Sequence, residues 1–214
     1  RFRQAFDTAP ISMFIVSLDE PDTGTVLETN ATAIIFTGRD RDDLTGASFA
    51  SLIHDDDAET VDRWIAACAE GHKAQVRGEV RFGPHAAGVS WGMVSASVVH
   101  LETRQPGQRA RYLLCLVEDI TARRAAEDAL VRQALHDDLT DLPNRVLLHD
   151  RLDFSLRSIA DDKHRRVGIL FCDLDGFKDV NDAYGHSTGD EVLREVAQRF
   201  SRAVDAHDTV ARLG

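Results

Sequence analysis

The sequence VGILFCDLDGFKDVNDAYGHSTGD, residues 167–190, is the most informative stretch of the chain. It opens with an apolar run that is rich in bulky residues and too short to span a membrane, a pattern that predicts a buried strand. The run ends at two acids, Asp173 and Asp175. Because side chains two residues apart on a strand point to the same face, these carboxylates share one site if the strand continues to Asp175.

The residue types after the apolar run indicate a phosphate-binding site. Hard oxygen ligands at the end of a strand, with a lysine nearby, are suited to Mg²⁺ that carries the phosphates of a nucleotide. For the two acids alone, a polar strand end capped by solvated carboxylates is the simpler interpretation. Lys178, the pair Asn181-Asp182 and the run GHSTGD at 185–190 favour the nucleotide site instead.

Two motifs carry a resemblance to a known family. The run DLDGFKDVNDAYGHSTGDEVL, residues 173–193, closely resembles the nucleotide-binding half of GGDEF domains, the diguanylate cyclases of bacterial second-messenger signalling. The run HDDLTDLPNR, residues 136–145, resembles the D-x-L-T-x-L-P-N-R signature at the start of the same domain. The two motifs stand in the family's order and cover the last third of the chain.

The resemblance implies a reaction and a set of site residues. Diguanylate cyclases condense two GTP molecules into cyclic di-GMP, with one nucleotide held by each domain of a dimer and Mg²⁺ (or Mn²⁺) neutralising charge. The resemblance assigns the Asp173 carboxylate and the Leu174 carbonyl to the metal, and Phe177 and Lys178 to the phosphates. The resemblance also implies that Asn181 and Asp190 read the guanine edge. It implies that three further residues support the site without touching the nucleotide: Asp175, Asp182 and His186.

An aspartate facing the base has a physical rationale. A carboxylate that accepts hydrogen bonds from N1–H and the exocyclic amine of guanine is left unpaired by adenine, which selects against the wrong base. By the same resemblance, Gly185 and Gly189 are expected to let the backbone turn beside the base.

The end of the chain gives two further expectations. Arg212-Leu213-Gly214 aligns with the residues that lead into the G-G-[DE]-E-F turn, of which only the first glycine is present. We expect an incomplete domain that lacks the catalytic acids, within a parent protein that is a nucleotidyltransferase. Many relatives carry R-x-x-D upstream as a product-inhibition site; Asp208 is retained but Asp205 replaces the arginine, so this inhibitory site is predicted to be absent.

Residues 1–121 show the pattern of a compact α/β module. Asn30 is placed to cap a short helix, and Gly71 to stop a longer one that carries Cys68. The expected elements are helices over 2–9 and 31–36, a longer helix after 52–57 that ends at Gly71, and strands over 11–18, 25–28, 74–82, 90–100 and 111–119. This order, ending in Asp119-Ile120-Thr121, resembles a PAS domain.

The signal that such a module senses is not predicted by the sequence, and its ligand stays unknown. Cys68 lies on an apolar helix face and favours packing over a flavin adduct. His54 and His72 are candidate haem ligands, but local hydrogen bonding is the stronger interpretation. Trp64 and Trp91 are expected to be core anchors rather than cofactor stacks.

Residues 122–136 form a predicted helix without glycine or proline, with Thr121 as its expected cap. One interpretation is a solvated linker. The other, implied by the domain order, is a short parallel coiled coil that joins two protomers along a narrow alanine-rich stripe and passes on a signal. Domain limits of 1–121, 122–136 and 137–214 follow.

Composition excludes some classes of function. The chain has 214 residues, 43% of them hydrophobic, and a net charge of −11, which argues against a nucleic-acid surface. No apolar run is long enough to cross a membrane. Three scattered cysteines show no zinc or disulfide spacing and are expected to be small buried hydrophobes in a reducing cytoplasm, although the parent protein has room for a membrane anchor outside this chain.

The predicted fold class is therefore α/β (α+β). It comprises a PAS fold with an antiparallel sheet and flanking helices, a linker helix, and the N-terminal half of a ferredoxin-like, palm-type cyclase domain. The leading functional hypothesis is a sensor-regulated diguanylate cyclase. The alternatives are a degenerate GGDEF domain that binds GTP as a regulator, for instance of a downstream EAL phosphodiesterase, and a PAS interaction module whose remaining chain is unfolded.

Overall fold

The computed structural model describes residues 2–85, 88–102, 109–159, 166–205 and 207–214. Internal contacts divide the chain into two units, residues 1–125 and 126–214. Each unit is described by itself. In the described part of the chain, no helix is both long and apolar enough to cross a lipid bilayer.

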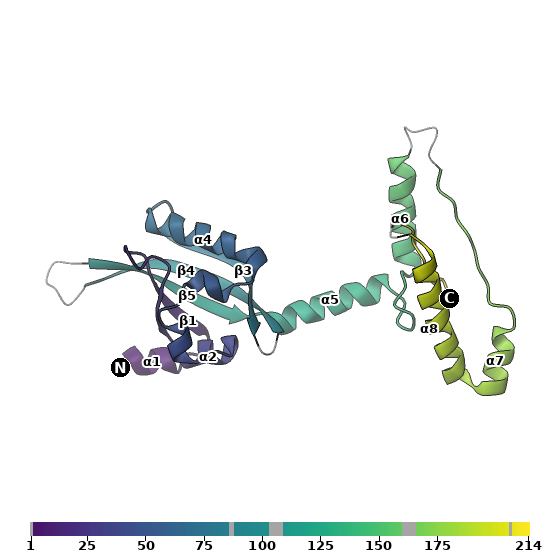
Figure 1. The fold of residues 1–214 in the computed structure, drawn as a ribbon, viewed down its shortest axis with the longest axis horizontal. Helices are drawn as coiled ribbons and strands as arrows, with labels where there is room; N and C mark the ends of the chain where they lie inside the picture. Colours follow the sequence, from purple (N-terminus) through teal and green to yellow (C-terminus); the bar gives the residue numbers. More distant parts are fainter. Residues whose placement is uncertain (1, 86–87, 103–108, 160–165, 206) are drawn as a thin grey trace. The chain divides into compact units, whose positions relative to one another are not determined.

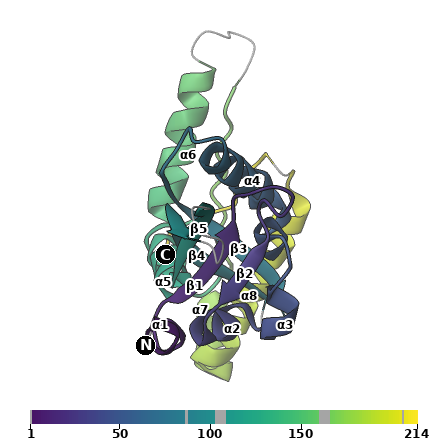
Figure 2. The same cartoon turned by 90° about the vertical axis from the view of Figure 1, so that its left-hand side faces the viewer.

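The first unit is built on one antiparallel sheet of five strands in the order β2-β1-β5-β4-β3 (Figures 1 and 2). The helices α2, α3, η1 and α4 separate the first two strands from the last three. The elements are α1 (Phe2–Asp7), β1 (Ser12–Ser17), β2 (Val26–Thr29), α2 (Ala31–Thr37), α3 (Arg41–Leu44), the 3₁₀ helix η1 (Phe49–Leu52), α4 (Asp55–Ala69), β3 (Gln75–His85), β4 (Gly88–Glu102) and β5 (Arg109–Asp119). All five predicted strands are therefore confirmed, as are the helices expected around Phe6, Ala33 and Ile65.

The core of this unit lies between one face of the sheet and the helices. Phe14 and Val16 of β1 are buried while Met13 and Ile15 are only half-buried, as the two-residue alternation of a strand requires. Phe14 and Phe82 each make an edge-on contact with Phe49 of η1. Such aromatic contacts stabilise a core beyond the area they bury.

Asn30 holds the start of the fold together. Its fully buried side chain caps α2 by accepting from the Ala33 N–H, and it also accepts from the Met13 N–H at 3.0 Å. Its amide donates to the Phe6 and Ile11 carbonyls at 3.1 and 2.9 Å. The predicted cap is thus confirmed, and the same side chain joins α1, β1 and α2 with its hydrogen-bonding capacity fully used.

The histidines and tryptophans of this unit have structural roles. His54 is the N-cap of α4 and its Nδ1 accepts from the Asp56 N–H, which confirms local hydrogen bonding. His72 is exposed beside Glu70. Trp64 packs partly buried against the core, but Trp91 is not a core anchor: the guanidinium carbons of Arg81 and Arg124 lie 5.6 and 4.8 Å from its ring centroid.

Two of the three cysteines are buried as predicted. Cys68 and Cys115 lie in the core, where burial raises the pKa of each thiol, so both are unreactive packing residues. The prediction was wrong for Cys172, which is exposed.

The second unit is helical in its described part. It contains the last ten residues of α5 (Thr121–Leu135), followed by α6 (Arg145–Ser158), α7 (Phe177–Tyr184) and α8 (His186–Ala203). Apolar residues recur at helical spacing around Leu152 and Val196, as α6 and α8 require. The packing of α7 on α8 speaks against an unfolded remainder.

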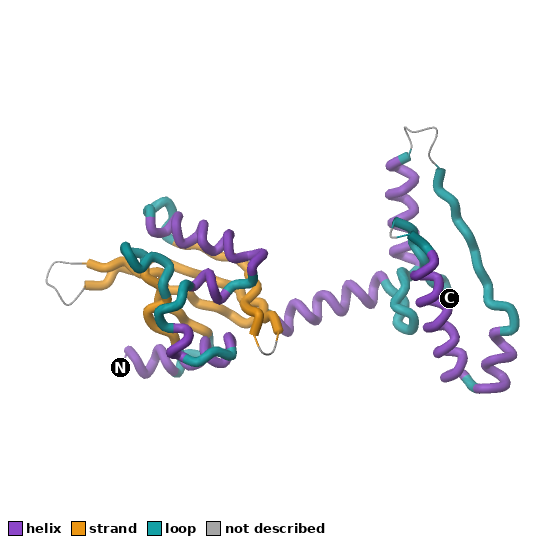
Figure 3. Tube along the Cα trace, viewed as in Figure 1, coloured by secondary structure: helices purple, strands orange, loops and turns teal. Residues whose placement is uncertain are grey.

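The strand predicted at the start of this unit's central motif is absent. Residues 166–175 are loop, and Ile169, Leu170 and Phe171 are 57%, 86% and 81% exposed (Figure 3). Residues 209–213 are also loop. A strand needs a hydrogen-bonding neighbour, and the described residues of this unit contain no strand beside either segment. The apolar pattern identified residues able to form a buried strand but not the partner they require.

We expect Asn30→Ala to lower the free energy of unfolding of the first unit by about 3 kcal/mol, because several buried backbone groups lose their partner at once. Chemical denaturation measures this loss. Asp40→Ala is the matched control, since Asp40 also precedes a helix but makes no side-chain cap bond; it should change stability by less than about 0.5 kcal/mol. Equal losses in the two variants would contradict the role of Asn30.

A second prediction concerns acid stability. Hydrogen bonds from Arg81 hold the pKa of Asp57 below its ordinary value, against the opposing effect of partial burial. A carboxyl whose pKa is depressed on folding stabilises the fold above its unfolded pKa, and this contribution is lost as the pH falls through the folded pKa. The free energy of unfolding should therefore decrease as the pH falls below about 4.

Arg81→Met should flatten this acid limb when the free energy of unfolding is measured against pH, whereas Arg3→Met should not. Arg3 is a suitable control because it forms an exposed ion pair with Glu28 at 3.7 Å. An acid limb that Arg81→Met leaves unchanged would show that the Asp57 pair is not its source.

Candidate functional site

The predicted site residues begin at a tight turn before α7. Gly176 has φ 73°, a conformation that favours glycine, and it is the N-cap residue of the helix. The Phe177 N–H donates to the Leu174 carbonyl at 3.3 Å, and the Val180 N–H to the Gly176 carbonyl at 3.2 Å. The turn therefore places the 173–175 segment directly before the N-terminus of an eight-residue helix, where backbone N–H groups favour anions.

A second turn joins α7 to α8 at Gly185. Its φ is 85°, and its N–H closes α7 by donating to the Asn181 carbonyl at 2.9 Å. Gly185 therefore provides the turn that was predicted. Gly189 does not, because it lies inside α8 and is buried.

Gly189 instead allows α7 and α8 to approach closely. A Cβ at this position would collide with Oδ1 of Asn181 and would lie 3.3 Å from the Phe177 ring. Asn181 and Phe177 of α7 are thus packed against the α8 backbone one residue before Asp190. Two predicted site residues of α7 therefore lie against the residue that precedes the third, Asp190.

The remaining predicted residues lie at the surface around this contact. Lys178, Asp182 and His186 are exposed, as are Asp173 and Asp175, while Asn181 and Asp190 are half-buried. In the described part of the chain, the Asp173 and Asp190 carboxylates make no hydrogen bond or ion pair with a side chain or backbone group. Both are therefore available to a ligand.

The metal was expected at Asp173 and Leu174. Among the described residues, no three acidic, histidine or cysteine side chains are grouped closely enough to hold a metal ion. One carboxylate and one carbonyl nevertheless fit Mg²⁺, which commonly binds through one or two carboxylates together with waters and substrate phosphates. The donors therefore fit an ion that arrives with a nucleotide better than a resident metal centre.

The segment predicted to lack an inhibitory site forms a closed turn. Oδ2 of Asp208 accepts from the Asp205 N–H at 3.2 Å, and the Asp208 N–H donates to the Asp205 carbonyl at 2.9 Å. Ala206, between them, lies outside the described residues. The retained Asp208 is thus engaged within its own turn.

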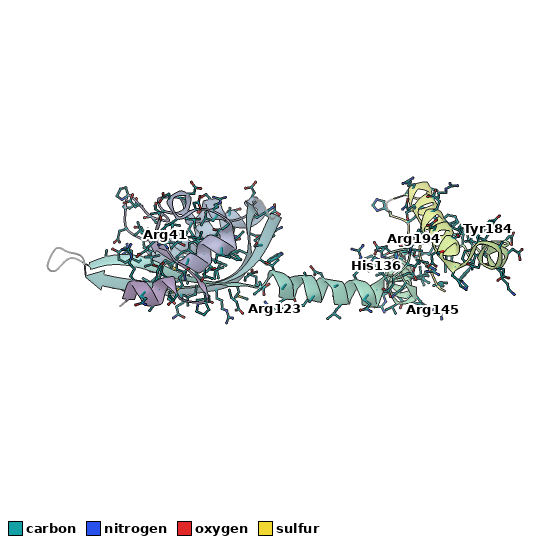
Figure 4. All side chains as sticks on the ribbon, turned by 90° about the horizontal axis from the view of Figure 1, so that it is seen from below. Arg41, Arg123, His136, Arg145, Tyr184 and Arg194 are labelled. Atoms are coloured by element: carbon teal, nitrogen blue, oxygen red, sulfur yellow. The ribbon has the colours of Figure 1, made fainter. Side chains whose placement is uncertain are left out.

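The second motif of the sequence analysis, residues 136–145, holds a hydrogen-bonded cluster that the sequence did not predict. We call this segment the junction loop (Figure 4, where His136 and Arg145 mark its ends). Oδ1 of Asp137 accepts from the Thr140 N–H and hydroxyl at 2.9 and 2.7 Å, and from Nη1 of Arg212 at 2.9 Å. Partial burial raises the pKa of Asp137, but the bonds from Thr140 and Arg212 outweigh it and hold the pKa below its ordinary value. The D-x-x-T spacing signals the local turn, whereas nothing local signals Arg212.

The exit of the first unit is a second polar cluster. The Trp91 N–H donates to the Thr121 hydroxyl at 2.9 Å, while Asp119 accepts from the Thr121 N–H. The prediction that the Thr121 side chain caps α5 is therefore wrong. The side chain joins the helix to β4 instead. Glu79 of β3 pairs with both Arg123 and Arg124, and the hydrogen bond from Arg124 is the main cause that lowers the pKa of Glu79.

Comparison with known proteins finds one family match in each half of the chain. The family described as "PAS fold" matches residues 1–120, and the family described as "Diguanylate cyclase, GGDEF domain" matches residues 134–214. The chain is 18% identical to the PAS domain of an HTR-like protein from Haloarcula marismortui, with a TM-score of 0.45 over 56% of this chain and 89% of that one.

Two curated relatives are similar in sequence. The bifunctional diguanylate cyclase/cyclic di-GMP phosphodiesterase MucR of Pseudomonas aeruginosa is 56% identical over 95 residues, which are 44% of this chain and 14% of MucR. The uncharacterized protein y4lL of Sinorhizobium fredii is 32% identical over all of this chain and 25% of its own length. The chain thus spans a quarter or less of these relatives.

Replacing Gly189 gives a test of the helix contact. Gly→Ala inside a helix ordinarily stabilises by about 0.5–1 kcal/mol, but Gly189→Ala should destabilise because its Cβ collides with Asn181. We expect faster amide hydrogen exchange across α7. Gly168→Ala is the control, since a Cβ there meets nothing within 4 Å. Slower exchange in Gly189→Ala would show that the helices are not in close contact.

Proposed function

Because the chain belongs to the PAS fold family and continues into a GGDEF domain, we propose that it is part of a sensor-regulated diguanylate cyclase, which condenses two GTP molecules into cyclic di-GMP. The proposal extends to the whole protein, of which relatives suggest this chain is a section. The description of the matched family as a diguanylate cyclase favours catalysis over a GTP-binding regulator without activity.

The observation that carries the proposal is the contact of Asn181 with α8 at Gly189, beside Asp190. It gives one half-buried amide and one half-buried carboxylate on neighbouring helices. An amide and a carboxylate supply the donor and acceptor pattern that guanine presents on its edge, and adenine would leave the carboxylate unpaired. In our proposal Asn181 and Asp190 read the base.

The phosphates belong at the other end of α7. The turn at Gly176 exposes the first N–H groups of the helix, and Lys178 adds an exposed cation. Mg²⁺ or Mn²⁺ bound with the nucleotide would supply charge neutralisation at the α-phosphate. Asp173 and the Leu174 carbonyl are the residues proposed to hold it, with Asp175, Asp182 and His186 in supporting roles.

The reaction requires two copies, and we propose that they pair through α5 and the PAS domain. In α5 none of the residues is buried, and Leu130 and Val131 are 67% and 58% exposed. So short a helix does not hold a dimer alone, which is why the PAS domain is included. We place the protein's catalytic unit in the cytoplasm, where GTP is available, and propose no product inhibition through Asp205 and Asp208.

Asp190→Ala in the full-length protein tests the base-reading assignment. We expect GTP affinity to fall by at least about tenfold, or 1.4 kcal/mol, and the preference for GTP over ATP to fall with it, because the carboxylate that rejects adenine is gone. Titration with each nucleotide in the presence of Mg²⁺ measures both. Glu191→Gln is the matched control, since Glu191 is the exposed acid next in the chain.

Two results would overturn the proposal. If the unaltered protein forms no cyclic di-GMP from GTP with either Mg²⁺ or Mn²⁺, it is not a cyclase. If Asp190→Ala keeps both affinity and guanine preference, the base is read elsewhere.

A further inference from the structure

We infer that Asp137 and Arg212 form a positioning contact, which ties the segment before the signature turn to the loop that grips the end of α5. The inference rests on the proposed function and adds to it a route from the linker helix to the reaction. Neither residue is assigned to substrate, and both are argued to act through their neighbours.

Asp137 is committed to two tasks by its geometry. Its carboxylate accepts from both Thr140 groups, which fixes the first turn of the junction loop, and from Arg212. Its own N–H donates to the Leu142 carbonyl at 2.8 Å. The loop is therefore folded around this carboxylate, and the position of Arg212 depends on it.

Arg212 is held by the same loop at a second point. Its backbone N–H donates to the Pro143 carbonyl at 2.9 Å. The Arg212 and Asp137 side chains are only 23% and 24% exposed, and Nε of Arg212 is buried without a hydrogen-bond partner among the described residues. A guanidinium removed from water in this way depends on its one carboxylate, so loss of either partner costs more than loss of a surface pair.

Other contacts to this segment are weaker. Arg145 reaches the Leu213 carbonyl at 3.5 Å, and Arg151 reaches the Thr209 hydroxyl at 3.3 Å, both at the surface. Their length and exposure make them poor constraints. The Asp137–Arg212 pair and the Arg212–Pro143 bond are therefore the contacts that fix residues 209–213.

The junction loop also grips the last turn of α5. Arg132 pairs with Asp141, the one described residue other than glycine with positive φ. The Asn144 side chain donates to the Ala134 carbonyl at 2.8 Å, and its N–H to the Leu135 carbonyl at 2.9 Å. Because the junction loop binds both the end of α5 and Arg212, a displacement of the end of α5 also displaces Arg212.

Arg212 lies two residues before Gly214, which the sequence resemblance places at the start of the signature turn. A shift of Arg212 therefore shifts the residues that the resemblance assigns to the reaction. The guanine-reading residues on α7 and α8 are separate from this contact. Loss of the pair should reduce turnover without reducing nucleotide binding.

Arg212→Met in the full-length protein is the test, because it breaks the pair and leaves the Asp137–Thr140 turn intact. We expect kcat for cyclic di-GMP formation to fall at least about tenfold while the Kd for GTP changes by less than about twofold. Arg212→Lys, which keeps the charge, should recover part of kcat. The control, Arg151→Met, should leave both constants unchanged. Equal kcat in Arg212→Met and Arg151→Met, or a parallel loss of GTP binding, would overturn the inference.

Hydrogen exchange separates this inference from the proposed function. In Asp137→Asn, exchange across residues 137–145 and 209–213 should be faster than in Arg151→Met, whether or not the protein is a cyclase. If the unaltered protein makes no cyclic di-GMP, the proposed function falls and with it the catalytic consequence, and faster exchange would then support the contact alone. Unchanged exchange in Asp137→Asn would overturn the contact itself.

Discussion

The close approach of α7 to α8 is the constraint on which the candidate site depends. It exists because residue 189 has no side chain, which leaves room for the Asn181 amide against the α8 backbone. Any larger residue would separate the helices and with them Asn181 and Asp190. The turns at Gly176 and Gly185 fix the two ends of α7. The end proposed to bind phosphate and the side proposed to read the base therefore belong to one short helix.

The first unit combines a stable sheet with a helix, α5, that begins directly after the last strand. Its core is closed by aromatic contacts and by the buried Asn30 amide. Its exit is polar: Thr121, Trp91, Glu79 and the two arginines of the first turn of α5 bind one another. Hydrogen bonds and ion pairs of this kind can be exchanged for others, as an element that transmits a signal requires. A packed apolar core, in contrast, does not adjust continuously.

Local patterns predicted most of the fold, and long-range pairings account for what they missed. The cap at Asn30 and the turn at Gly185 follow from residue type and neighbours. The Thr121 hydroxyl was expected to cap its own helix, yet it binds the Trp91 N–H, thirty positions away. The apolar run at 167–172 was expected to be a buried strand, but a strand depends on a neighbour that no residue within the run specifies. The exposure of Cys172 follows from the same cause, and Arg212 was missed because its partner Asp137 is 75 residues distant.

The central claim is that α7, α8 and the turn before them bind a guanine nucleotide with its metal ion. The most direct measurement is amide hydrogen exchange of the full-length protein with and without a non-hydrolysable GTP analogue and Mg²⁺. The account predicts protection concentrated at residues 173–190, with none from the ATP analogue at the same concentration. Protection confined to other parts of the protein, or equal protection by both analogues, would contradict it.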